Sequence, residues 1–227
     1  MRNIGRTIAV SRDARGGVVL LHGIGVGAWT LRRLERALRQ GGYATLNLGY
    51  ASRCKPLEAL VEDIHPGIAD FAARCDGPIH FVAHSMGGLL TRLYVATHRP
   101  ERLGRVVMLG TPNGGSEIAD RLKHFGVYRA WFGPAGQLVT QRDAAVAAMF
   151  PPVDYPVGII AGNRSVYSIR SAFLPKPHDG KVSVENTKLD GMADHIVMET
   201  SHPWLVRNGP AIEQTIVFLR DGEFRRS

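Results

Sequence analysis

Residues 79–90 read Ile79-His80-Phe81-Val82-Ala83-His84-Ser85-Met86-Gly87-Gly88-Leu89-Leu90, and this stretch decides the fold. The apolar run over 79–83 predicts a buried strand, and the leucines that follow Gly88 predict a helix. Ser85 therefore lies at a sharp turn between a strand and a helix. Such a turn accepts only small residues two positions before and two positions after its centre, and Ala83 and Gly87 meet this requirement.

The same alternation of short apolar strands and amphipathic helices extends over most of the chain. Because strands that alternate with helices form parallel sheets, we expect an α/β fold. Its core is a doubly wound, mainly parallel sheet of about six strands, with helices on both faces. The expected strands cover 18–21, 44–48, 79–83, 105–109, 157–161 and 195–199, and the expected helices begin near Leu31, Pro56, Met86 and Pro210.

One segment interrupts this alternation of strands and helices. The length of 227 residues and the 44% hydrophobic content fit a single domain over 1–227. Within it, residues 113–155 contain only helical pieces, and insertions of this length are often functional. We hypothesise a small helical cap in which Trp131 and Phe132 line a substrate pocket. The alternative is that these helical pieces simply pack on the sheet.

Charge and apolar runs limit the classes of partner. The net charge of +8 is spread along the chain rather than gathered with aromatic residues, so we expect no nucleic acid partner. No run approaches the roughly 20 apolar residues of a transmembrane helix, and residues 1–6 lack a secretory signal. With Met1 as the native start, these features predict a cytoplasmic protein in which Cys54 and Cys75 are free. Peripheral membrane contact and the oligomeric state stay open.

A serine at such a turn is a candidate nucleophile. Its hydroxyl needs an exposed position, a base and donors for the oxyanion that forms on attack. The alternative for Ser85 is a serine that merely starts a helix. The preceding strand, the following helix and a His22-Gly23 pair at the end of an earlier strand favour the nucleophile. The Met86 N–H, at a helix start, is a candidate oxyanion donor.

Sheet geometry favours His202 over His195 as the candidate base. Catalytic groups gather at the carboxyl ends of parallel strands. His202 follows the last expected strand, whereas His195 opens that strand and belongs at the opposite edge. We interpret His80 and His84 as structural. The candidate acids between Ser85 and His202 include Asp154, Asp179, Asp190 and Asp194, with Asp120 as a more distant alternative.

The chain resembles the α/β-hydrolase superfamily, specifically its lipase-like and esterase-like members. The likeness rests on Ala83–Gly88, His22-Gly23, the run 110–116 and the histidine region near the end, and it covers most of the chain. Alanine at 83 replaces the usual glycine. The family order of serine, acid and histidine implies Ser85, Asp179 and His202, because His178-Asp179-Gly180 resembles the segment that bears the family's acid.

The resemblance also implies an oxyanion hole and a reaction. Ile24, directly after His22-Gly23, would supply the second N–H beside Met86, with His22 and Gly23 close to the substrate. The implied function is a serine hydrolase, an esterase or a lipase, acting on small-molecule or lipid esters without metal or cofactor. The same residues would serve a thioesterase or an acyltransferase. A ligand-binding protein that keeps the fold without the chemistry is the alternative of a different class.

Overall fold

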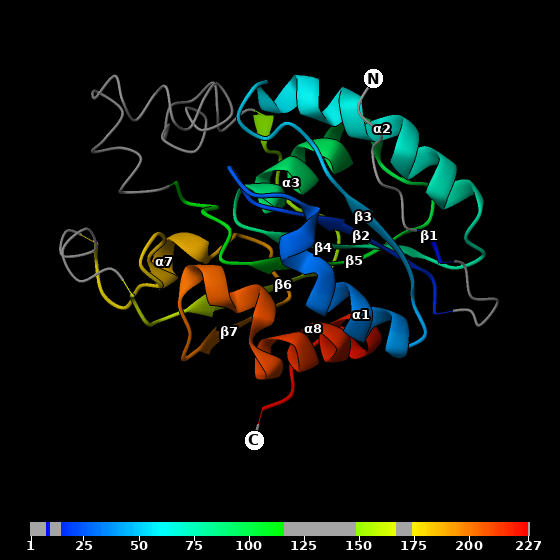
Figure 1. Ribbon diagram of the computed structural model, residues 1–227. Helices are drawn as coiled ribbons and strands as arrows, with labels where there is room; N and C mark the ends of the chain where they lie inside the picture. Colours follow the sequence, from blue (N-terminus) through cyan, green and yellow to red (C-terminus); the bar gives the residue numbers. More distant parts are fainter. Residues whose placement is uncertain (1–7, 10–14, 116–148, 167–173, 227) are drawn as a thin grey trace.

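The computed structural model describes residues 8–9, 15–115, 149–166 and 174–226. A sheet in the order β1-β3-β2-β4-β5-β6-β7 forms its centre (Figure 1). All neighbouring strands run parallel except the short β1 (Ile8–Ala9), which pairs antiparallel with β3. The expected doubly wound α/β fold is therefore confirmed. The parallel strands are β2 (Gly17–Leu21), β3 (Ala44–Leu48), β4 (Ile79–His84), β5 (Leu103–Leu109), β6 (Val157–Gly162) and β7 (Asp194–Met198).

Helices cover both faces of this sheet. The helices α2 and α3 lie on one face and α1 and α8 on the other (Figure 1). The described helices are α1 (Arg32–Gln40), α2 (Leu57–Ala73), α3 (Met86–His98), α7 (Val184–Thr187) and α8 (Gly209–Asp221), with 3-10 helices η1 (Ala28–Leu31) and η2 (His202–Arg207).

The core consists of two layers, one on each face. Along β2 the side chains alternate between these layers: Val19 and Leu21 pack toward α2 and α3, while Val18 and Leu20 pack toward α1 and α8. All four are fully buried. A strand buried on both faces reads as a continuous apolar run, which is why the sequence predicts β2 within one residue.

The carboxyl ends of the parallel strands share one edge of the sheet. The loops after β2, β4, β5, β6 and β7 all leave from this edge. Residues far apart in sequence therefore meet there. Most of the hypothesised cap over 113–155, with its expected helical pieces, lies outside the described residues.

Close packing at this edge explains the glycine at position 87. In the first turn of α3, a Cβ on Gly87 would lie 2.4 Å from the Leu21 carbonyl oxygen and 2.7 Å from that of His22. Both atoms belong to the backbone, so they cannot move aside cheaply. The start of α3 therefore packs directly on the end of β2.

We predict that Gly87→Ala lowers the free energy of unfolding by about 1–3 kcal/mol, because the added methyl overpacks this contact. Urea denaturation measures the change. Gly209→Ala is the matched control, since a Cβ at this helical glycine would meet nothing within 4 Å. Equal losses of stability in the two variants would contradict the packing argument.

Candidate active site

The turn between β4 and α3 holds Ser85 in a strained backbone conformation. Ser85 has φ 56° and ψ −128°, and among the described residues no other non-glycine residue has positive φ. Such a conformation costs about 1–3 kcal/mol and persists only where surrounding contacts impose it. Here the Ser85 N–H donates to the Leu109 carbonyl at 2.9 Å, and the Thr111 hydroxyl donates to the Ser85 carbonyl at 3.1 Å. Strand β5 and the loop after it therefore hold the turn in place.

Three side chains from separate loops form a hydrogen-bonded series at this edge. Ser85 Oγ lies 3.0 Å from His202 Nε2, and His202 Nδ1 lies 2.6 Å from Asp179 Oδ2. An ionised carboxylate can only accept, so Nδ1 carries a proton; in the neutral ring, Nε2 then has the lone pair that faces the serine hydroxyl. The structure thus brings together Ser85, His202 and Asp179, the three residues that the sequence and its family resemblance predicted as nucleophile, base and acid.

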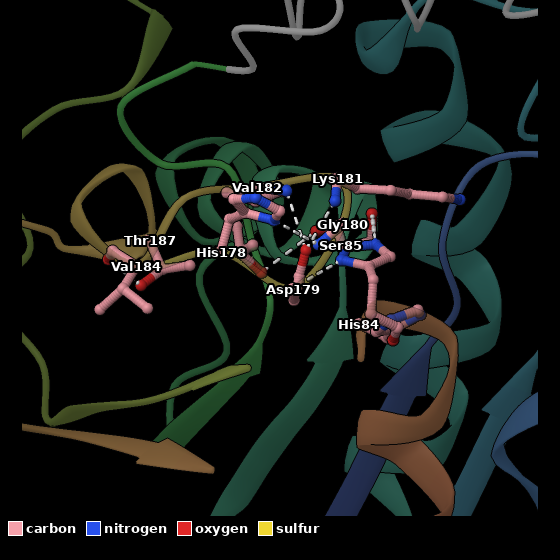
Figure 2. Close-up of polar contacts among 11 residues, drawn as sticks. His84, Ser85, His178, Asp179, Gly180, Lys181, Val182, Val184 and Thr187 are labelled. Atoms are coloured by element: carbon pink, nitrogen blue, oxygen red, sulfur yellow. Dashed lines mark hydrogen bonds and ion pairs between the residues drawn. The ribbon is translucent and has the colours of Figure 1, made fainter. Parts of the chain in front are cut away.

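The surroundings of Asp179 keep its carboxylate charged. Asp179 is fully buried, and its Oδ1 accepts from the backbone N–H groups of Lys181 and Val182 at 2.9 and 2.8 Å (Figure 2). Burial alone would raise the pKa of Asp179. The His202 ring and these two N–H groups outweigh it and hold the pKa below its usual range. His202 is thus anchored to a negative charge.

Two glycines make room for this pair. Gly110, which directly follows β5 and has φ +59°, would place a Cβ 3.1 Å from both Asp179 Oδ2 and His202 Nδ1. A Cβ on Gly162 would lie 2.9 Å from the Asp179 Cβ and 2.5 Å from the Thr200 carbonyl oxygen. No sequence pattern assigned these glycines a role in the site. The sequence feature that could have identified them is their position at the carboxyl ends of β5 and β6, where site residues gather.

His84 supports His202 from within the sheet. It is buried, its Nε2–H donates to the His202 carbonyl at 3.0 Å, and the two ring centroids are 4.8 Å apart. Burial, helped by repulsion from His202, lowers the pKa of His84 to about 3. His84 is therefore neutral at physiological pH and acts on His202 through packing and one hydrogen bond.

The loop after β2 lies directly against the serine. A Cβ on Gly23 would be 3.1 Å from the Ser85 Cβ, so the Gly23 backbone borders the nucleophile. Met86 is the first residue of α3, and N–H groups in the first turn of a helix have no partner within the helix. The loop that carries Ile24 and the helix start at Met86 therefore both border Ser85.

Residues after β3 fix the shape of this loop. The ring of the buried His22 stacks on that of Tyr50 with centroids 4.1 Å apart, and the Tyr50 hydroxyl donates to the His22 carbonyl. Ser52 Oγ accepts from the Gly25 N–H at 3.1 Å. The backbone is thus held on both sides of Ile24. Tyr50 and Ser52 were not predicted as site residues, although both lie just after a strand that ends at the carboxyl edge.

The alternative acids and the competing histidine lie elsewhere. Asp154, ahead of β6, binds Arg99, and Asp194, at the start of β7, binds Arg226. Both therefore sit at the amino edge of the sheet, as does His195, which contacts Thr187 at 3.0 Å. Asp190 is exposed just ahead of β7, and Asp120 lies outside the described residues.

Several expectations cannot be placed at this site. Trp131 and Phe132 fall within 116–148, outside the described residues. In the part of the chain that the structure describes, no group of three or more potential metal ligands gathers, and no helix is long and apolar enough to cross a membrane. Cys54, exposed, and Cys75, buried, are both free.

Comparison with protein families and solved structures gives the wider context. The model of the Alpha/beta hydrolase family matches residues 18–212. No curated protein sequence matches the chain.

Similar solved structures include three lipolytic proteins. Lipase BlEst2 of Bacillus licheniformis, in its mature form, shares 16% identity over 94% of each chain with a TM-score of 0.69. A structure of the metagenome-derived lipolytic enzymes LipS and LipT shares 19% identity over 95% of this chain and 96% of that one, with a TM-score of 0.66. A monoacylglycerol lipase of Paleococcus ferrophilus shares 15% identity over 97% of this chain and all of that one, with a TM-score of 0.65. At these identities the likeness establishes the fold.

The buried neutral His84 predicts a pH dependence of stability. Its pKa is about 3 in the fold and about 6.5 in the unfolded chain, so between these values the unfolded chain binds more protons. The free energy of unfolding should therefore fall as the pH drops from about 6.5 toward 3. His84 should contribute a slope of roughly 1 kcal/mol per pH unit.

Urea unfolding of the wild type and His84→Gln between about pH 4 and pH 7 tests this. The variant should show a shallower slope, whatever its absolute stability. Burial also lowers the pKa values of His22, His80 and His195, but these residues are present in both proteins, so the difference isolates His84. His98→Gln, at a partly exposed histidine bonded to Glu62, is the control. Identical slopes for the wild type and His84→Gln would refute the prediction.

Proposed function

The chain belongs to the alpha/beta hydrolase family, and from this we propose that it hydrolyses carboxylic esters as an esterase or a lipase. One observation carries the proposal: His202 lies between the Ser85 hydroxyl, at 3.0 Å, and the Asp179 carboxylate, at 2.6 Å. A serine hydroxyl becomes an effective nucleophile when an adjacent base takes its proton and a third group orients that base. These three side chains can perform these roles.

In the proposed reaction His202 Nε2 takes the proton of Ser85 as Oγ attacks the ester carbonyl carbon. The N–H groups of Met86 and Ile24 stabilise the oxyanion of the tetrahedral intermediate. When this intermediate collapses, the leaving alcohol takes the proton from His202 and Ser85 keeps the acyl group. Water, deprotonated by His202, then attacks the acyl-enzyme and releases the acid, and Ser85 recovers its proton.

Asp179 acts in this scheme by remaining charged. Once His202 has taken the serine proton, it is an imidazolium ion inside the protein, where an unpaired charge would be costly. The carboxylate at 2.6 Å offsets that cost and keeps the ring in the orientation that points Nε2 at Ser85. The two backbone N–H groups on Oδ1 hold the carboxylate itself in place.

The choice of carboxylic esters over other acyl compounds draws on the similar lipolytic structures. Thioester hydrolysis and acyl transfer to an alcohol pass through the same acyl-enzyme, so the site residues do not separate them. Product partition between water and an added alcohol, together with relative rates on matched esters and thioesters, would distinguish these reactions.

We predict that a fluorophosphonate probe labels Ser85 and that the chain hydrolyses short activated esters. Ser85→Ala should abolish labelling, and His202→Ala and Asp179→Asn should each lower kcat by about 10³–10⁴-fold. Mass spectrometry of the labelled peptide and ester kinetics give the readouts. Ser201→Ala is a control, because Ser201 is a buried serine next to His202. Absence of both labelling and ester cleavage in folded protein would overturn the proposal.

The contacts of Tyr50 predict a more selective effect. Tyr50→Phe removes the hydroxyl that holds the His22 carbonyl, so the Ile24 N–H should be placed less well for the oxyanion. We expect kcat to fall by about 10-fold with little change in KM. Tyr94→Phe is matched to it, since the Tyr94 hydroxyl bonds His65 away from the site. A loss confined to KM, or equal losses in both variants, would contradict this role.

A further inference from the structure

Exposed apolar side chains gather beside the candidate active site. Five large hydrophobic residues are exposed among those described, and three of them are Val26, Trp29 and Trp204, with exposed fractions of 40%, 58% and 55%. Val26 and Trp29 follow the loop that carries Ile24. Trp204 lies in η2, two residues after His202. The segments that supply the catalytic groups thus also present these side chains to solvent.

Arg207 links the two indoles. Its guanidinium carbon lies 6.0 Å from the Trp29 ring centroid and 5.9 Å from that of Trp204. Cation–π attraction at these distances favours keeping both rings close to the arginine. More than half of each tryptophan still faces solvent. We call Val26, Trp29, Trp204 and Arg207 the tryptophan rim.

The surface next to the tryptophan rim is positively charged. Arg32 and Arg33, three and four residues after Trp29, and Arg36 are exposed on α1. Helix α1 lies beside α8, which follows Arg207, on one face of the sheet (Figure 1). In the described ranges, no ion pair with an acidic residue involves Arg32, Arg33, Arg36 or Arg207. The rim and α1 therefore offer apolar area together with positive charge.

We propose that the tryptophan rim docks on an anionic lipid surface and so presents the active site to esters held in that surface. Indole rings favour the boundary between headgroups and acyl chains, and arginines beside them attract anionic headgroups. The inference rests on the proposed function, because the rim borders the site that would receive the ester. A nucleic acid is a less suitable partner, because single-stranded DNA or RNA binds along a positively charged groove and the two indoles are not part of one.

Vesicle flotation of the full chain tests the proposal. The vesicles are made of ether-linked lipids, which an esterase cannot cleave, either neutral phosphatidylcholine or phosphatidylcholine with phosphatidylserine. We expect the protein to float with the anionic vesicles far more than with the neutral ones. Arg207→Gln should weaken this binding by about fivefold, and Trp29→Ala with Trp204→Ala by tenfold or more.

Controls separate the rim from general charge attraction. Arg74→Gln removes an exposed arginine just ahead of β4, at the opposite edge of the sheet, and should bind vesicles as the wild type does. Hydrolysis of a short soluble ester should be unchanged in the rim variants, while hydrolysis of an ester embedded in anionic vesicles should fall with binding. Binding by a chain that cleaves no ester would support the rim and overturn the proposed function.

Other outcomes would overturn the inference. One is the absence of binding to anionic vesicles, and another is an equal loss in Arg74→Gln and Arg207→Gln. A third is a tryptophan double variant that still binds anionic vesicles but loses stability or activity on the soluble ester. That result would mean that the two tryptophans stabilise the packing of η1 against η2. Tighter binding of a single-stranded oligonucleotide, lost in the same double variant, would identify a nucleic acid surface instead.

Discussion

The crowded turn at Ser85 is the constraint on which the site depends. A non-glycine residue at positive φ is stable only if its neighbours leave no easier conformation. Strand β5 bonds its N–H, Thr111 bonds its carbonyl, and α3 begins so close to β2 that position 87 has no room for a side chain. The same crowding brings the loop of Gly23 against the serine. The contacts that pack the fold at this edge are therefore the same contacts that set the geometry of the site.

Burial and hydrogen bonds distinguish the histidines that the structure describes near Ser85. His22 and His84 both lie close to Ser85, but burial lowers the pKa of each. His22 uses its ring nitrogens on Gly23 and Tyr50, and His84 bonds the His202 backbone. Among the histidines that the structure describes, only His202 faces both a buried carboxylate and the serine hydroxyl. The rings of His22 and His84 therefore act as structural supports beside the proposed triad.

Local patterns in the sequence were enough to predict the strands and Ser85 and, together with the family order of the residues, His202. A run such as Val18–Leu21 carries its own signal, and Ser85 and His202 follow strands whose carboxyl ends must share an edge. Asp179 needed the family resemblance, because several aspartates satisfy the spacing. Gly110, Gly162 and Tyr50 were not predicted as site residues. Their importance lies in contacts between distant parts of the chain, which no local sequence pattern encodes. The two-residue β1 is too short to show a period.

The separation in sequence of the three central side chains has a consequence for biosynthesis. Ser85 and His202 are 117 residues apart, and Asp179 precedes His202 by 23. Contacts between such distant positions form late, because the intervening chain must first be ordered. Until β6 and β7 have joined the sheet and η2 has packed beside it, the base that we propose for Ser85 is not in place. Under the proposed function, a partly synthesised chain would be inert, and Ser85 would become reactive only after these later segments have folded.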